Sequence, residues 1–242
     1  MLETFAVITA GGTGQRMGSQ VPKQFLALHN KPLILHTLQA FQDCSDIHAI
    51  VLTLPPHMFS EWPLQRFHQY GISKLFAVVP GDKTRQLSVY QGLKALPASA
   101  RFVAIHDGAR CLITPQAIAH TLDALKIGDV EGMILATPVK DTLKEVHSGR
   151  IVKTLDRSQL WAMQTPQVFR FPRILEAHRR IADQGHQDAT DDAAVLELDG
   201  GQVRVHESLE FNLKVTYPQD IALAEVILAD RETKKEEQLR GH

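Results

Sequence analysis

The stretch FAVITAGGTGQRMGSQVPKQ at residues 5–24 constrains the fold of this chain more than any other. It opens with an apolar run at residues 5–8, which is typical of a strand covered on both faces of a sheet. The run ends at Gly11, Gly12 and Gly14, which allow a sharp turn and let backbone N–H groups approach an anion closely. Arg16 and Lys23 follow. The stretch therefore predicts a strand and a phosphate-binding loop whose cations can stabilise charge that develops on phosphate during a reaction.

Two familiar phosphate motifs do not match this loop. The P-loop pattern Gly-x4-Gly-Lys-Ser/Thr does not occur in the sequence. The dinucleotide pattern Gly-x-Gly-x-x-Gly begins at Gly12 and Gly14, but position 17 is Met and the next glycine is Gly18. The second predicted strand, at residues 47–54, also lacks the terminal acid that binds a ribose. A nicotinamide enzyme is therefore not expected.

Short apolar runs alternate with amphipathic stretches along the chain, which predicts an α/β fold. We expect a Rossmann-like, mostly parallel twisted sheet with helices on both faces, within a single domain over residues 1–242. The expected strands lie at residues 5–8, 47–54, 75–79, 102–105, 132–139 and 203–205. The expected helices lie at residues 32–41, 57–70, 115–126, 172–182 and 220–231, with a further helix ending at residue 96. The charged tail at residues 231–242 is expected to be a solvated or frayed helix end.

Residues 140–146 and 150–155 flank His147, Ser148 and Gly149, a pattern that predicts a β-hairpin. Polar residues occupy many positions on both strands, so the hairpin is poorly suited to a core. We interpret residues 139–157 as an arm that leaves the main sheet and packs on a second subunit, which makes the protein a homodimer. The alternative is a pair of strands at the edge of the main sheet.

Two further loops are expected beside the glycine loop, because ligands in open α/β sheets bind beyond the carboxyl ends of the strands. The loop after residue 79 supplies Gly81, Arg85 and Ser88, which suit the recognition of a nucleotide, although a solvated helix N-terminus also fits them. Asp107 follows the strand at residues 102–105, where a divalent metal or an anchoring carboxylate belongs. We interpret the neighbouring His106 as structural.

The acids at residues 188–192 admit two interpretations, a metal site or a helix N-terminus. We favour a helix capped by Thr190 or Asp191, because the helix dipole favours acids there. The remaining histidines show no metal-ligand spacing.

The charge and cysteine content exclude several classes of protein. A formal net charge of −1 gives no general attraction to nucleic acid or to anionic membranes. No apolar run is long enough to span a membrane, and no signal peptide is recognisable. Cys44 and Cys111 are too few for a disulfide framework, so we expect buried thiols and a cytoplasmic protein.

The glycine loop with its Pro-Lys-Gln sequence resembles the loop of nucleotidyltransferases. The later segments GDKTRQLSV, HDGAR, PVKDTLK, TLDRSQLW, QTPQVF, ATDDA and NLKVT extend the likeness. Over nearly its whole length the chain resembles the 2-C-methyl-D-erythritol 4-phosphate cytidylyltransferase family, which acts in the non-mevalonate isoprenoid pathway.

The resemblance implies that CTP and a polyol phosphate are the substrates and that pyrophosphate is released. The residues implied in catalysis are Arg16, Lys23, Arg157 and Lys214. Those implied in nucleotide binding are Ala10, Gly11, Gly12, Thr13, Gly14, Gly81, Asp82, Arg85, Ser88 and Asp107. Those implied in acceptor binding are Asp107, Arg110, Thr142, Arg157, Thr165, Thr190 and Lys214. Thr142 and Arg157 correspond to arm residues that reach the acceptor bound in the partner subunit.

The implied reaction is attack by a phosphate oxygen of the acceptor on the α-phosphorus of CTP. A phosphate is already anionic near neutral pH, so no general base is required, and the sequence contains no signature of one. The site must instead align two anions and neutralise charge, with Mg²⁺ bridging phosphate oxygens and Asp107 as its candidate protein ligand.

Asp82 stands where the family usually has Gly, and Gly108 and Cys111 stand where it has Ala and Pro. Two other functions remain open at the level of sequence. One is cytidylyl transfer to another polyol phosphate, such as ribitol 5-phosphate. The other is a CTP-binding regulator without catalysis.

Overall fold

The computed structural model describes residues 3–11, 22–185 and 189–240. Of the predicted site residues, Gly12, Thr13, Gly14 and Arg16 lie outside these ranges, as does Asp188. In the described part of the chain, no helix is both long and apolar enough to cross a membrane.

The main sheet has seven strands in the order β11-β7-β10-β6-β1-β4-β5. Their bounds are β1 Thr4–Thr9, β4 Ala49–Leu54, β5 Leu75–Pro80, β6 Phe102–Asp107, β7 Gly132–Pro138, β10 Trp161–Arg170 and β11 Val203–Glu207. Neighbouring strands are parallel except at β10, which runs antiparallel to both β6 and β7. The prediction of a mostly parallel α/β sheet is confirmed.

Strand β10 was not among the predicted strands, because polar residues and Pro166 interrupt its apolar alternation. Its pairing with β7 shifts register between Met163 and Gln167, so part of the strand departs from a regular ladder. The polar residues at this irregularity face the candidate site described below.

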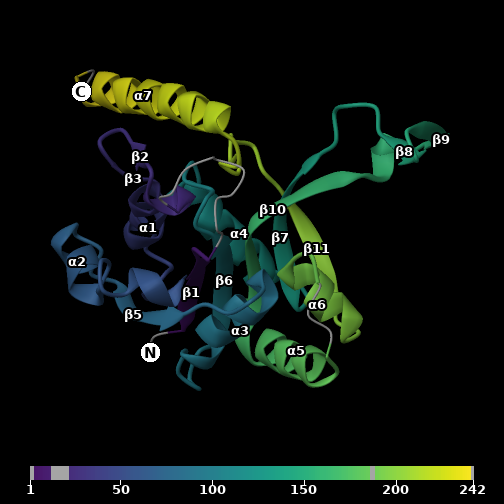
Figure 1. The fold of residues 1–242 in the computed structure, drawn as a ribbon, viewed down its shortest axis with the longest axis horizontal. Helices are drawn as coiled ribbons and strands as arrows, with labels where there is room; N and C mark the ends of the chain where they lie inside the picture. Colours follow the sequence, from purple (N-terminus) through teal and green to yellow (C-terminus); the bar gives the residue numbers. More distant parts are fainter. Residues whose placement is uncertain (1–2, 12–21, 186–188, 241–242) are drawn as a thin grey trace.

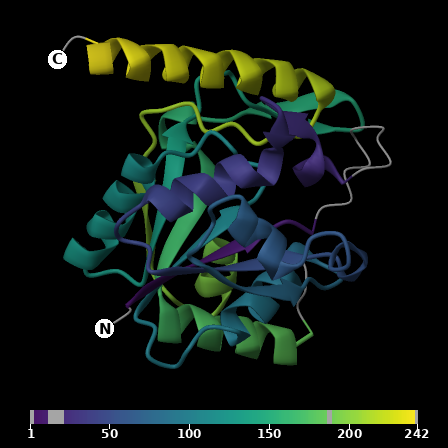
Figure 2. The ribbon, with the colours of Figure 1, turned by 90° about the vertical axis from the view of Figure 1, so that its left-hand side faces the viewer.

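Helices cover both faces of the sheet. One face packs against α1 (Leu33–Asp43), α2 (Leu64–Gln69) and α4 (Pro115–Ile127). The other packs against α3 (Arg85–Lys94), α5 (Phe171–Asp183) and α6 (Asp192–Leu198). The last helix, α7 (Pro218–Arg240), lies on the opposite side of the molecule from α5 (Figures 1 and 2). It packs near the start of α1, and a two-stranded ribbon of β2 (Ala27–Leu28) and β3 (Lys31–Pro32) lies beside it.

The predicted helix over residues 57–70 is confirmed only for residues 64–69. The structure has a 3-10 helix, Pro56–Met58, and then the short α2. Pro63 separates them, because proline lacks an N–H group and disfavours helical geometry in the residue before it. Trp62 and Phe67 are nevertheless buried in the core, as predicted.

The hairpin is formed by β8 (Lys144–His147) and β9 (Arg150–Thr154), which pair only with each other. All of their residues are exposed, and the hairpin projects away from the body of the molecule (Figure 1). The alternative that these strands extend the edge of the main sheet is therefore wrong.

The parallel strands bring three loops to one edge of the sheet. Thr9 at the end of β1 pairs with Thr53 in β4 and with Asp107 at the end of β6. Leu54 at the end of β4 pairs with Pro80 at the end of β5. The glycine loop, the Gly81 loop and the loop after Asp107 therefore begin side by side, as the sequence predicted.

Candidate active site

Two neighbouring cavities lie at this edge. The first has a volume of about 340 Å³ and is lined by Thr9, Gly11, Lys23, Gln24, Asp82, Lys83, Thr84, Arg85, Ser88, Asp107, Ala109 and Lys214. The second has a volume of about 310 Å³ and is lined by Arg85, Asp107, Arg110, Met163, Gln164, Thr165, Gln167, Thr190, Asp191 and Lys214. Arg85, Asp107 and Lys214 line both cavities, and we call these three residues the shared wall.

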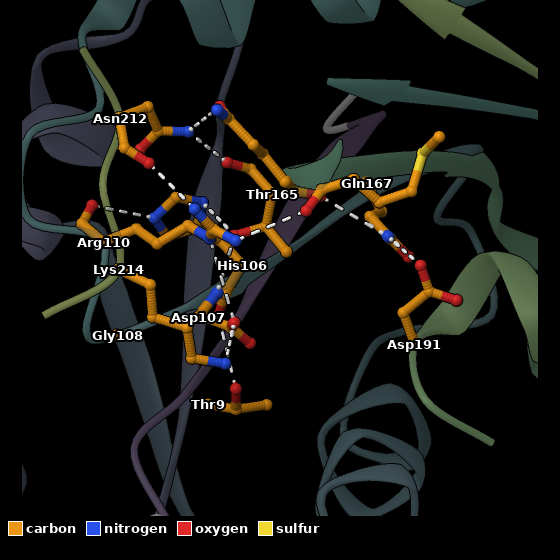
Figure 3. Close-up of polar contacts among 12 residues, drawn as sticks. Thr9, His106, Asp107, Gly108, Arg110, Thr165, Gln167, Asp191, Asn212 and Lys214 are labelled. Atoms are coloured by element: carbon orange, nitrogen blue, oxygen red, sulfur yellow. Dashed lines mark hydrogen bonds and ion pairs between the residues drawn. The ribbon is translucent and has the colours of Figure 1, made fainter. Parts of the chain in front are cut away.

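Asp107 is the centre of the shared wall. Arg85 donates from Nε to its Oδ1 at 2.8 Å, and Lys214 donates from Nζ to its Oδ2 at 2.7 Å. Arg110 Nε lies 4.0 Å from the same Oδ2. Burial alone would raise the pKa of Asp107, but Arg85 and Lys214 hold that pKa well below its usual range. Asp107 therefore stays anionic, and Figure 3 shows it beside Arg110 and Lys214.

A chain of hydrogen bonds fixes the backbone of Asp107. Burial lowers the pKa of His106 to about 3, so its ring is neutral. Its Nε2 lies 3.2 Å from the Arg110 carbonyl and must carry the proton, so Nδ1 accepts from the Thr165 hydroxyl at 3.0 Å. The Thr165 oxygen in turn accepts from the Asp107 N–H group at 3.1 Å. His106 is thus a structural residue, as predicted, and Thr165 holds the end of β6.

Lys23 lies in a 3-10 helix, Lys23–Phe25, and only 8% of it is exposed. Its Nζ donates to the Val215 carbonyl at 2.9 Å, and the Val215 N–H group donates to the Ala109 carbonyl at 2.9 Å. Phe25 packs on Trp62 with ring centroids 4.8 Å apart. The segment around Val215 therefore ties the Lys23 helix to the end of β6, and it places Lys214 on the same cavity.

The Gly81 loop is held by Ser88. The Ser88 hydroxyl accepts from the Asp82 N–H group at 2.9 Å and donates to the Thr84 carbonyl at 2.8 Å. A Cβ at Gly81 would lie 3.2 Å from the Ser88 hydroxyl, a tight contact that glycine avoids. The exposed Asp82 carboxylate accepts from the Lys83 N–H group at 2.7 Å and from Gln91 at 3.0 Å. Asp82 is thus anchored to α3.

The described start of the glycine loop also borders the first cavity. Ala10 is fully buried and donates its N–H group to the Thr53 carbonyl at 3.0 Å, which continues the β1–β4 pairing by one residue. Gly11 is exposed and lines the cavity.

The second cavity is bordered by the N-terminus of α6. Asp191 caps this helix by accepting from the Ala194 N–H group at 2.9 Å, as predicted. Gln167 accepts from the N–H groups of Asp192 and Ala193, both at 3.0 Å, and donates to Asp191 at 2.8 Å. Its position toward Asp191 is seen in Figure 3. Thr190 is exposed at the mouth of this cavity, free of the capping role.

Sequence reasoning missed three groups that organise the site. Gln167 holds the α6 N-terminus, and Asp192 contacts Arg85 from behind the cavities. Asn212 donates to Gln164 at 3.0 Å and to the Thr165 carbonyl at 2.8 Å, and its own carbonyl accepts from Arg110 at 2.8 Å. Gln167 and Asn212 lie in the segments QTPQVF and NLKVT, but the bonding partners named above are 24 or more residues away in the sequence.

Among the described site residues, Ala10, Gly81, Thr142 and Arg157 line neither cavity. Ala10 and Gly81 adjoin Gly11 and Asp82, which line the first cavity, whereas Thr142 and Arg157 lie on the arm. Thr142 is exposed at the start of the arm. Arg157 is exposed at the base of the arm and donates to the Lys140 carbonyl. Among the residues that the structure describes, no group of three or more His, Cys, Asp or Glu side chains could hold a metal ion.

Comparisons with known proteins match this chain over most of its length. A family model described as 2-C-methyl-D-erythritol 4-phosphate cytidylyltransferase matches residues 4–230. A relative from Desulforamulus reducens with that name is 42% identical over 230 residues, which cover 93% of this chain and 96% of the relative. Another with the same name, from Microcystis aeruginosa, is 43% identical and covers 94% of this chain and 99% of its own.

A solved structure is similar as well. The crystal structure of 4-diphosphocytidyl-2C-methyl-D-erythritol synthase from Anaerococcus prevotii aligns with a TM-score of 0.80 at 26% identity, covering 94% of this chain and 96% of that one. The region matched by the family model includes all the described residues that line the two cavities.

Proposed function

The chain belongs to the 2-C-methyl-D-erythritol 4-phosphate cytidylyltransferase family, and we propose that its shared wall separates and aligns the two substrates. The protein is a nucleotidyltransferase that transfers the cytidylyl group of CTP to 2-C-methyl-D-erythritol 4-phosphate in isoprenoid precursor biosynthesis. One observation carries the proposed arrangement: the two cavities meet at Arg85, Asp107 and Lys214.

CTP occupies the first cavity in this proposal. The loop from Gly81 to Ser88 borders the base and ribose, and its backbone is held by the Ser88 hydroxyl. Lys23 and Lys214 line the same cavity and contact the phosphates in this proposal. The family resemblance assigns Arg16 to the same phosphates. This cation set suits the neutralisation of charge on the α-phosphate and the leaving pyrophosphate.

The acceptor occupies the second cavity. Arg110 offers a planar fork for its phosphate, while Thr165 and Thr190 lie on the same cavity. A phosphate oxygen then attacks the α-phosphorus across the shared wall, the new phosphorus–oxygen bond forms and pyrophosphate leaves. Asp107 acts by holding Arg85 and Lys214, because its two oxygens already accept from those cations.

Three single variants test this assignment, each assayed by pyrophosphate release. Ser88→Ala should raise the KM for CTP, because Ser88 lines only the first cavity. Arg110→Ala should raise the KM for the acceptor, because Arg110 lines only the second. Lys214→Ala should mainly lower kcat. The reverse pattern for Ser88 and Arg110 would contradict the assignment of the cavities.

We propose that Mg²⁺ is bound mainly by the triphosphate. Magnesium commonly binds one or two carboxylates together with substrate phosphates and water. The described carboxylates that line the two cavities already accept hydrogen bonds, Asp107 from Arg85 and Lys214, Asp82 from Gln91 and Asp191 from Gln167. These residues fit an ion with one protein ligand at most. Calorimetry should find CTP binding weakened by EDTA and restored by Mg²⁺.

We propose that the arm pairs two copies of the chain. Val146, Ile151 and Val152 are apolar side chains exposed on the hairpin, and Leu209 and Phe211 are exposed near its base. A third cavity of about 520 Å³ lies at that base, between residues 137–143 and 208–213. In such a dimer Thr142 and Arg157 contribute to the acceptor site of the partner, which accounts for their distance from both cavities here.

We also propose that residues 1–242 are one domain, with residues 139–157 as its arm, and that the enzyme is cytoplasmic. The main sheet draws strands from residue 4 to residue 207, which supports one folding unit. Cys44 and Cys111 are both free and buried, which suits a reducing compartment.

A further inference from the structure

A second acid lies behind the shared wall and contacts the same arginine as Asp107. Asp192 is the first residue of α6 and is fully buried. Its Oδ2 lies 2.8 Å from Arg85 Nη2, and its Oδ1 lies 3.2 Å from Nε2 of the fully buried His178 in α5. The Arg85 guanidinium is thus held between two carboxylates, Asp107 on the cavity side and Asp192 on the interior side.

The burial of the Asp192 carboxylate costs folding free energy, so stability alone does not explain it. A buried carboxylate is expensive, and replacing a buried ion pair by apolar side chains is often neutral or stabilising. The carboxylate of Asp192 balances the charge of Arg85 at 2.8 Å and lies 3.2 Å from His178 Nε2. The helix dipole favours an acid in the first turn, but an exposed acid would serve it equally well. The burial of Asp192 therefore calls for another reason.

We propose that Asp192, held by His178, is a positioning residue that orients Arg85 so that Asp107 and Lys214 face both substrates. The proposal rests on the assignment of the shared wall above and names a residue that acts on it from outside the cavities.

The geometry explains how Asp192 acts. With Nη2 drawn toward Asp192, Arg85 presents Nε to one oxygen of Asp107, and the other oxygen remains with Lys214. Without Asp192, the planar guanidinium is free to turn and engage both oxygens of Asp107, as arginine commonly does with a carboxylate. Lys214 would then lose its partner and its fixed position between the two cavities.

Other contacts keep the backbone near Asp192 in place, so a change of its side chain is informative. Gln167 accepts from the N–H group of Asp192 at 3.0 Å, and Gln86 accepts from that of Ala189 at 3.2 Å. Asp191 caps α6 independently. Asp192→Asn keeps the size of the side chain, removes the charge that holds Arg85 and replaces one acceptor oxygen by an NH2 group.

The test is a double-mutant cycle of Asp192→Asn with Arg85→Lys, assayed by the kcat of pyrophosphate release from the full-length enzyme. Because small misplacements of reacting groups cost up to about 100-fold, Asp192→Asn should lower kcat by about 10- to 100-fold. Lysine lacks the planar fork with which Arg85 reaches Asp107 through Nε and Asp192 through Nη2. Asp192→Asn should therefore change kcat less than about threefold in the Arg85→Lys background. Equal losses in both backgrounds, or a wild-type kcat for Asp192→Asn, would overturn the proposal.

Asp199→Asn is the matched control. Asp199 follows the last turn of the same helix and pairs with Arg173 and Arg180, which lead away from both cavities. It should lower the melting temperature and leave kcat unchanged. A loss of kcat in this variant as large as that of Asp192→Asn would mean that damage to α6 alone explains both, and the proposal would fail.

His178 offers a second route if Asp192→Asn folds poorly. His178→Gln retains an N–H donor for Asp192, whereas His178→Leu removes it. The proposal expects the leucine variant to reproduce the kcat loss and the glutamine variant to keep more of the wild-type value. Equal kcat values for the two would contradict it. A wild-type kcat for Arg85→Lys would instead contradict the proposed function of the shared wall. A failure of that proposal can therefore be distinguished from a failure of the role proposed for Asp192.

Discussion

At the scale of single residues, the chemistry depends on one anion surrounded by cations. Asp107 is kept ionised by Arg85 and Lys214, so it contributes a fixed charge and not a proton. The His106 ring beside it is neutral and holds the Thr165 hydroxyl. Neither of these two described groups serves as a general base, which suits a reaction whose nucleophile is already a phosphate anion.

Lys23 provides the first residue-scale prediction. Lys23→Ala should lose roughly 2.7–4 kcal/mol of transition-state stabilisation, by analogy with the loss of one oxyanion-hole donor. The measurement is kcat for pyrophosphate release at saturating substrates, and Arg16→Ala should behave alike. Lys126→Ala is the matched control, because Lys126 pairs with Asp46 and Asp123 away from both cavities. Wild-type turnover in Lys23→Ala would contradict the assignment of Lys23 to catalysis.

Gly108 provides a second residue-scale prediction. A Cβ at this position would lie 2.6 Å from Ile34 Cδ1 and 3.0 Å from the Thr9 carbonyl oxygen. Gly108→Ala should therefore destabilise the protein by about 1–3 kcal/mol through overpacking, measured by urea unfolding. Ile34→Val removes the clashing Cδ1 and should recover part of the loss when the two are combined. Simple addition of the two losses would contradict this explanation.

At the scale of elements, apolar strands and strand-end loops could be predicted from sequence, whereas interrupted elements could not. The runs at residues 5–8 and 49–54 are buried throughout, so their composition alone indicates strands. Strand β10 carries Pro166 and the polar Gln164, Thr165 and Gln167, so its pattern resembles a loop. Its place between β6 and β7 depends on pairing with residues far away in the sequence.

The same limit applies to the site. Asp107 and Lys214 were each expected there, but their ion pair joins positions 107 residues apart, and only the folded sheet brings them together. The sequence predicts a helix N-terminus at residues 188–192, and Asp191 caps the helix that begins at Asp192. Its contact with Arg85 depends on the packing of α3 against α5 and α6, which no local pattern records.

The arm provides an element-scale prediction about assembly. Ile151 on β9 is 67% exposed, and Ile151→Asp should convert a dimer into a monomer of 27.0 kDa, because it places a charge in the proposed interface. Light scattering coupled to size-exclusion chromatography measures the mass. Val226→Asp on α7 is the control, with the same exposure and no role in the interface. A monomeric wild type, or an unchanged mass for Ile151→Asp, would contradict the proposal.

Arg157 provides the matching prediction about the acceptor. Arg157→Ala should raise the KM for the acceptor and leave the KM for CTP nearly unchanged, because Arg157 reaches a partner's acceptor in the proposed dimer. Arg179→Ala, an exposed arginine on α5, is the control. An acceptor KM equal to that of the wild type would count against this role.

At the scale of the whole molecule, a common α/β fold carries its candidate active site at one edge of the sheet. Helices cover both faces of the sheet, and three loops from β1, β5 and β6 meet at the carboxyl ends of the parallel strands. The antiparallel β10 and the N-terminus of α6 add the second cavity beside the first. Transfer between two substrates requires two such cavities with a common wall.

The choice of acceptor is the most direct test of this account. Pyrophosphate release should be measured with CTP and Mg²⁺, offering 2-C-methyl-D-erythritol 4-phosphate and ribitol 5-phosphate in separate reactions. We expect rapid release with the methylerythritol phosphate and little with the ribitol phosphate. A preference for ribitol 5-phosphate, or tight CTP binding without release with either acceptor, would contradict the central claim.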